Sequence, residues 1–180
     1  MRSVAFLICL STLILGVEFH LKGGIPFGYT PILDGDMERS WRNSLEFRAG
    51  KEIESFRLMR DEHSVFLLIE LTNDSSYYIG KSRYLDVFSG KSCWTDGTLL
   101  RIPFKFWKGR AYVFTVKNGV QRISGFSGVG FGKYIELSIP APSLRVWNLC
   151  IRFLDSRTLD ILESYEMVVY SGENDEAGGS

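Results

Sequence analysis

The sequence has few of the residues that mark a catalytic or metal-binding protein. It contains three cysteines and two histidines in 180 residues. No CxxC pair occurs, and His20 and His63 do not complete a zinc-binding set. No Ser-His-Asp arrangement is visible either. Glu70 and Glu136 are strand carboxylates that suggest an acid pair, but Glu70 lies in a covered strand. We therefore expect that the protein is not an enzyme.

The sequence also lacks an excess of charge and a long hydrophobic run. Lys plus Arg equals Asp plus Glu at 21 each, which gives no electrostatic reason to expect nucleic acid or an anionic membrane as a partner. The apolar run 4–17 follows Arg2 and is shorter than the roughly 20 residues of a membrane-spanning helix. A basic start before a short apolar run is typical of a secretory signal peptide.

These features divide the chain into three parts. Residues 1–17 are interpreted as a signal peptide or, if uncleaved, as an N-terminal anchor, which would be the one route to a membrane. Residues 24–170 form one domain, and residues 171–180 form a disordered acidic tail. We expect a secreted or envelope-associated, extracytoplasmic protein. Export would permit a disulfide between Cys93 and Cys150, although we favour two separate thiols, with Cys150 buried in a strand.

What the sequence does contain is many short apolar segments separated by turn residues. Hydrophobic residues make up 45% of the chain, and 18 glycines fit frequent turns. No long amphipathic helix is indicated. We expect an all-β antiparallel sandwich, jelly-roll-like, with about ten strands and at most short helical turns. The expected strands are 45–47, 53–60, 65–72, 83–88, 98–107, 110–117, 120–123, 134–139, 147–154 and 165–170.

The segments between these strands carry local signals of their own. Asp34-Gly35 predicts a tight turn, followed by one helical turn at 37–41 with Asp36 as its N-cap. Trp41 is expected to fill one end of the core. Asn118-Gly119 suits a type I′ hairpin turn. Residues 73–82 and 125–132 are expected to be loops.

The order of five segments resembles the family 9 carbohydrate-binding modules and, more loosely, the DOMON-like sandwiches. The segments are ILDGDMERSW, FRLMRDEHSVFLLIELTND, YLDVF, GKYIELSIP with Glu136, and WNLCIRFLD ending at Asp155. The resemblance spans about residues 31–170. It implies a β-sandwich and makes Glu136 a residue of the fold.

The resemblance also implies where a sugar would bind. In the sugar-binding members two Trp residues clamp a sugar ring, one in the loop before the YLDVF-like strand and one before the last strand. This chain offers Tyr77 and Tyr78 in the first loop and no Trp in the second segment, 161–165. Haem-binding relatives use a Met and a His, and nothing marks Met59 and His63 as such a pair.

A sugar site needs flat aromatic surfaces and a few polar groups for the hydroxyls. The candidate ligand-binding residues are Tyr77, Tyr78, Trp94, Asp96, Arg101 and Trp107, with Lys91 as a further polar contact. A structural role is equally open for Trp94 and the Tyr pair, and is favoured for Trp107.

Two other readings of the sequence remain open. Asp34, Asp36 and Glu38 suggest calcium, but a capped turn is the preferred interpretation. For function, we expect non-catalytic binding of a carbohydrate or cell-surface glycan. The alternative is a structural domain that contacts envelope proteins and has lost the sugar clamp.

Overall fold

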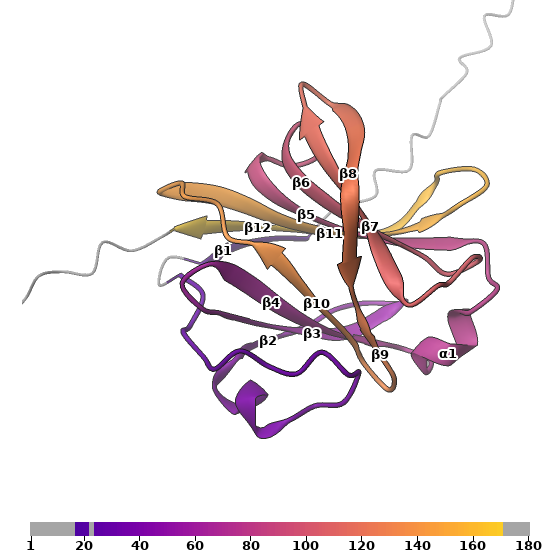
Figure 1. The fold of residues 1–180 in the computed structure, drawn as a ribbon, viewed down its shortest axis with the longest axis horizontal. Helices are drawn as coiled ribbons and strands as arrows, with labels where there is room; N and C mark the ends of the chain where they lie inside the picture. Colours follow the sequence, from indigo (N-terminus) through magenta and orange to yellow (C-terminus); the bar gives the residue numbers. More distant parts are fainter. Residues whose placement is uncertain (1–16, 22–23, 171–180) are drawn as a thin grey trace, which may run out of the picture.

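The computed structural model describes residues 17–21 and 24–170, and its fold is a sandwich of two β-sheets (Figure 1). The larger sheet has the strand order β1 (Val17–Leu21), β12 (Ile161–Tyr170), β11 (Val146–Asp155), β5 (Arg83–Ser92), β6 (Asp96–Pro103), β7 (Arg110–Lys117), β8 (Val120–Gly128). The smaller sheet has the order β2 (Leu45–Arg48), β3 (Ile53–Arg60), β4 (Ser64–Leu71), β10 (Ile135–Pro140), β9 (Gly130–Phe131).

The expected all-β class is confirmed. Strand pairs are antiparallel except for β1, which runs parallel to β12. The described helices are short: a 3-10 turn, η1 (Arg39–Asn43), and α1 (Ser75–Tyr78). The expected signal peptide or anchor and the acidic tail lie outside the described residues, apart from Val17, which begins β1.

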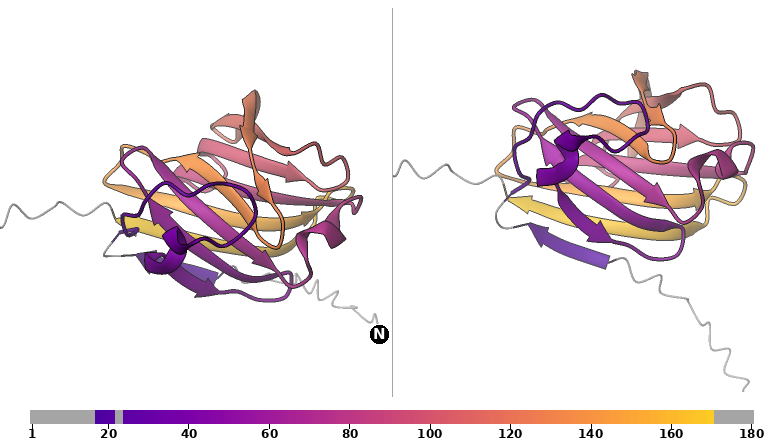
Figure 2. Two further views of the ribbon diagram at one scale, coloured as in Figure 1. Left: turned by 60° about the horizontal axis from the view of Figure 1, so that its bottom comes forward. Right: turned by 90° about the horizontal axis from the view of Figure 1, so that it is seen from below.

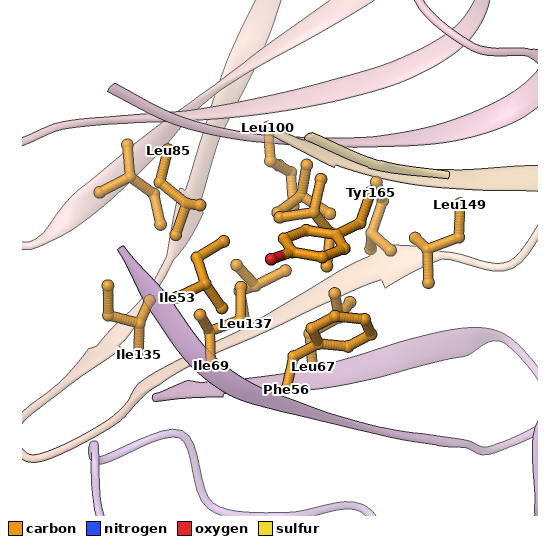
Figure 3. Packing of buried hydrophobic residues seen from close by; sticks show 14 of the residues in the cluster. Ile53, Phe56, Leu67, Ile69, Leu85, Leu100, Ile135, Leu137, Leu149 and Tyr165 are labelled. Atoms are coloured by element: carbon orange, nitrogen blue, oxygen red, sulfur yellow. The ribbon is translucent and has the colours of Figure 1, made fainter. Parts of the chain in front are cut away.

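The main core lies between the two sheets, where alternate side chains of facing strands meet (Figure 3). The central strand β4 is buried on both faces. Leu67 points into the main core, whereas Phe66 and Leu68 point outward and form a second cluster with Trp41 and Met59. The expectation that Trp41 fills one end of the core is therefore wrong. Trp41 packs on the outer face of the smaller sheet, because β4 presents apolar side chains on that face as well.

One buried carboxylate holds the segment that carries Trp41. Glu136 on β10 accepts hydrogen bonds from the backbone N–H groups of Asp34 (3.0 Å) and Gly35 (2.8 Å) through Oε2. Its Oε1 accepts one from the Trp41 indole at 2.8 Å. Burial raises the pKa of the Glu136 carboxyl, while these three donors oppose that shift. Both oxygens of Glu136 are therefore used by the fold.

Several local expectations need correction. The helical turn starts at Arg39 with Glu38 at the N-cap position, not Asp36, and no side chain caps it. The expected loop 125–132 is largely strand, because β8 runs on to Gly128 and pairs with β7. β6 ends at Pro103, earlier than expected, and α1 lies within the expected loop 73–82.

Other turns behave as their residues indicate. Gly35 has φ of +93°, as the Asp-Gly turn requires, and Asn118 and Gly119 have φ of 50° and 75°. Positive φ at both central residues is the condition for a type I′ turn. This turn joins β7 and β8 into a hairpin that projects from the body of the sandwich (Figures 1 and 2).

The preference for two separate thiols is wrong, because Cys93 and Cys150 form a disulfide with a Cα–Cα distance of 6.1 Å. It joins the β5–β6 turn to β11 on the outer face of the larger sheet. A disulfide is consistent with an extracytoplasmic location. Across residues 17–21 and 24–170, no helix has the length and hydropathy needed to cross a bilayer.

Candidate functional site

The aromatic residues proposed for sugar binding do not converge on one groove. Tyr78 is buried, with its ring centroid 5.6 Å from that of Phe104 and 5.4 Å from that of Phe153. Its neighbour Tyr77 is 54% exposed. Trp94 lies on the outer face of the larger sheet. The candidate residues therefore fall in separate regions, and each region has to be considered separately.

The first region is a cavity of about 490 Å³ at one end of the sandwich. Figures 1 and 2 show α1 and the β11–β12 turn at this same end. The lining is mainly polar and comes from three separate parts of the chain: Glu52, Asn73, Tyr77, Tyr78, Gly80, Lys81, Ser82, Arg83 and Arg157. We call this the end cavity.

The single helical turn α1 places Tyr77 at the wall of the end cavity. Asp74 is its N-cap, and the carboxylate accepts a hydrogen bond of 2.8 Å from the backbone N–H of Ser76. Hydrogen bonds from Ser76 lower the pKa of Asp74, so the cap is charged at neutral pH. The Tyr77 ring is exposed, with the Lys81 ammonium 4.4 Å from its centroid.

Asp155, the last residue of β11, binds two residues of the lining. Its carboxylate accepts a hydrogen bond of 2.5 Å from the Arg83 guanidinium and one of 2.8 Å from the backbone N–H of Arg157. The bond from Arg157, foremost, lowers the pKa of Asp155. A charged Asp155 thus holds the Arg83 side chain and the Arg157 backbone, and both residues line the end cavity.

The end cavity also contains an acceptor, Glu52. The Tyr78 hydroxyl donates a hydrogen bond of 3.0 Å to the Glu52 carboxylate. Burial, foremost, raises the pKa of Tyr78, so the phenol stays protonated and keeps donating. The end cavity therefore offers cationic donors, a carboxylate acceptor and one exposed ring.

Sequence reasoning found the Tyr pair but missed Glu52, Asn73, Lys81, Arg83 and Arg157. Their types are common on any surface, and they are distant in the sequence. Only Arg83 and Arg157 had a signal in the sequence. Arg83 is the first residue of an expected strand, and Arg157 lies two residues after Asp155, where another expected strand segment ends.

The second region is the outer face of the larger sheet, which holds Trp94 and Arg101. Asp86, fully buried, accepts two hydrogen bonds of 2.7 Å from Arg101 and two of 2.9 and 3.1 Å from Arg152. Hydrogen bonding to Asp86 raises the pKa of Arg101. The Arg152 guanidinium lies 3.9 Å from the centre of the Trp94 ring. Trp94 also packs on Phe88, with ring centroids 5.6 Å apart.

The remaining candidates have structural contacts. Asp96 accepts a hydrogen bond of 3.2 Å from the backbone N–H of Asn118. Trp107 stacks on Phe131 at 4.4 Å and packs against the main core. The Lys91 side chain is exposed, and the backbone carbonyl oxygen of Lys91 accepts a hydrogen bond from the side-chain amide of Asn148.

The residues considered for calcium and haem are separately placed. The Asp34 carboxylate accepts a hydrogen bond of 2.9 Å from the backbone N–H of Asp36. Met59 is buried in the second cluster and His63 is exposed. Among the residues that the structure describes, no group of three or more His, Cys, Asp and Glu side chains is arranged to hold a metal ion.

Comparison with known proteins does not assign this geometry. No protein-family model, no curated protein and no solved structure matches the chain.

Proposed function

We propose that the protein is a non-catalytic carbohydrate-binding domain that takes a saccharide in the end cavity. The observation that carries this proposal is one exposed aromatic ring, Tyr77, at a mainly polar cavity of about 490 Å³. A pyranose ring packs its C–H face on such a ring while its hydroxyls need polar partners. The end cavity supplies both.

Sugar hydroxyls both donate and accept hydrogen bonds, so a site needs both kinds of group. Lys81, Arg83 and Arg157 donate, Glu52 accepts, and the Asn73 amide does both. Several of these groups are already held in place. Asp155 holds Arg83, and Tyr78 holds Glu52. This pre-organisation reduces the entropy lost when a ligand binds.

The resemblance to the family 9 carbohydrate-binding modules supports the same location. The loop before the YLDVF strand and the turn before the last strand carry the sugar clamp in that family. In this chain the first segment supplies Tyr77, which lines the end cavity, and Arg157, which also lines it, lies in the turn just before the second segment, 161–165. The second segment has no Trp, and its one aromatic residue, Tyr165, is buried, so we propose binding against one ring and not between two.

A thermal-shift panel of mono- and oligosaccharides, including glucose and xylose types, tests the proposal on the full-length protein. A ligand at 100 times its Kd would stabilise the fold by about 2.7 kcal/mol, which is a shift of several degrees in Tm. Tyr77→Ala should abolish the shift without lowering the Tm of the free protein. Tyr29→Ala removes another exposed Tyr, 86% exposed and outside the cavity, and should keep the shift.

Trp94→Ala separates the two regions. The Trp94 ring does not line the end cavity, so this variant should respond to saccharide as the wild type does. Loss of the shift in Trp94→Ala but not in Tyr77→Ala would place the sugar on the larger sheet instead. A blank result across the whole panel would contradict the proposal.

The alternative is a structural or protein-interaction domain of the cell envelope. It is favoured by the lack of a second aromatic wall and by Leu159, which is 60% exposed in the β11–β12 turn. A blank saccharide panel together with concentration-dependent self-association would support this alternative.

A further inference from the structure

One part of this neutral chain carries basic residues but no acidic ones. Residues 97–135 contain seven of the 21 Lys and Arg residues and none of the 21 Asp and Glu residues. The remaining 14 basic residues therefore share the rest of the chain with all 21 acidic ones. This acid-free stretch forms β6, β7, β8 and β9 and the start of β10.

Part of this stretch encloses a hollow of about 230 Å³, distant in the sequence from the Tyr77 cavity. We call it the aromatic hollow, and its lining is Pro103, Phe106, Lys108, Arg110, Tyr112 and Phe126. Phe106 is 65% exposed and Phe126 is 55% exposed, which is unusual for Phe.

Cations lie against these exposed rings. The Arg110 guanidinium is 4.9 Å from the centroid of Phe126, and the Lys105 ammonium is 5.3 Å from that of Phe106. Within residues 17–21 and 24–170, no carboxylate pairs with Lys105, Lys108 or Arg110. The aromatic hollow therefore combines apolar rings with uncompensated positive charge.

The hollow continues into a row of side chains across the larger sheet. Directly opposed residues on five neighbouring strands form this row: Phe126, Tyr112, Arg101, Asp86 and Arg152. Strands in a sheet are about 4.8 Å apart, so the row spans about 19 Å. Trp94 covers its far end through its contact with Arg152. Aromatic rings thus lie at both ends of the row and two arginines lie between them, along a path long enough for a short polymer segment.

We propose that this row and the aromatic hollow bind an acidic polysaccharide. A sugar ring packs on Phe106 or Phe126, and Lys108 and Arg110 bind its carboxylate or sulfate group. The single acid of the row, Asp86, is buried and bound by two arginines, so it does not repel an anionic chain. This site is separate from the end cavity and does not depend on a sugar binding there.

The placement of the apolar side chains favours a polysaccharide over a lipid bilayer. A membrane-inserting hairpin carries apolar residues at its tip. At the β7–β8 tip a single exposed apolar residue, Val120, lies opposite Lys117 and beside Asn118 and Gly119, and the exposed Phe rings lie back at the hollow.

Affinity electrophoresis of the full-length protein tests the proposal, with polygalacturonate as the acidic polymer and dextran as the neutral one. Polygalacturonate should retard the protein, and salt should weaken this effect, whereas any retardation by dextran through the end cavity should be the same in the wild type and in the hollow variants. Lys108→Ala with Arg110→Ala should weaken binding about tenfold or more. Phe106→Ser with Phe126→Ser should also weaken polygalacturonate binding. The dependence of this binding on salt concentration should stay unchanged, because no charge is removed.

The matched control is Arg39→Ala with Arg42→Ala, which removes two exposed cations from η1. This control should change the affinity by less than about twofold. Equal losses in the control and in the hollow variants would show non-specific charge attraction and overturn the proposal. Retention of polygalacturonate affinity in Lys108→Ala with Arg110→Ala would overturn it too.

Two further probes distinguish other anionic partners. Vesicles of phosphatidylglycerol and phosphatidylcholine report on membranes, and a labelled thymidine oligonucleotide reports on nucleic acid. Residues 1–17 are common to all variants, so a difference between variants reports on the hollow alone. Hollow-dependent binding to vesicles or oligonucleotide without binding to polygalacturonate would overturn the proposal. Tyr77→Ala should leave polygalacturonate binding unchanged, so the two proposed sites can fail independently.

Discussion

Replacing Glu136 by Gln tests whether this buried carboxylate holds the opening segment to the smaller sheet. Glu136 accepts three hydrogen bonds, two from backbone N–H groups and one from the Trp41 indole. Gln has one acceptor oxygen, and its NH₂ group donates. If the amide oxygen keeps the two backbone bonds, the NH₂ group faces the Trp41 N–H, and a buried donor loses its partner.

A buried donor without a partner costs about 1–3 kcal/mol. The two backbone bonds also weaken, because their acceptor is no longer charged. The burial that raises the pKa of Glu136 acts in the opposite sense, because a neutral side chain is easier to bury. We therefore expect Glu136→Gln to lower the free energy of unfolding by about 1–3 kcal/mol, or roughly 1 M in the urea midpoint.

A double-mutant cycle with Trp41→Phe makes the test specific. Trp41→Phe removes the indole donor, so the Gln NH₂ group no longer meets another donor. Glu136→Gln should then cost at least about 1 kcal/mol less in the Trp41→Phe background than in the wild type. Urea denaturation followed by circular dichroism measures both costs, and Glu54→Gln, on an exposed Glu of β3, is the control. Equal costs within about 0.3 kcal/mol in the two backgrounds would refute the reasoning.

Three further perturbations test other contacts of the fold. Replacing Cys93 and Cys150 by Ser should lower the unfolding free energy by about 4 kcal/mol, because their 57-residue separation closes a long loop; a urea midpoint unchanged by the double substitution would rule this out. Gly35→Ala should lower the unfolding free energy, measured by urea denaturation, by about 1–3 kcal/mol or more. The φ angle of Gly35 is +93°, and an added Cβ would lie 2.2 Å from a backbone nitrogen of the β9–β10 turn. Gly125→Ala, with open space around the new Cβ, should be tolerated far better. Hydrogen bonds hold the pKa of Asp155 in the folded protein below its value in the unfolded chain. The stability that Asp155 contributes is therefore present above about pH 4 and is lost as the pH falls further. Asp155→Asn should therefore lower Tm at pH 7, with the gap to the wild type closing in acid; a gap independent of pH would contradict this.

Much of the fold could be predicted because local patterns specify it. Alternating or continuous apolar residues locate most of the strands, and Asp34-Gly35 and Asn118-Gly119 form the turns that their residue types favour. The errors occur where tertiary contacts override such signals. The Gly-rich composition of 125–132 predicts a loop, but β7 pairs with residues 125–128 and β10 pairs with residues 130–131, so most of the stretch is strand.

The candidate site was predictable only in part. Loop position made Tyr77 a sound candidate, but the same reasoning also selected Tyr78, whose ring packs into the core, and Trp107, which covers Phe131. Exposure of a loop aromatic depends on what lies next to it in space. Local sequence does not contain that information.

By itself, the sequence determined the all-β class, the central strand β4 and the principal turns, because these depend on residues within a few positions of one another. Only the tertiary structure decided which distant groups meet. Glu136 lies 102 positions from Asp34, and the disulfide joins cysteines 57 positions apart. The same holds for the end cavity, where Tyr77 and Arg157 come from opposite halves of the domain. Such contacts depend on the stacking of two sheets, and periodicity along the chain specifies each strand but not its partner across the core.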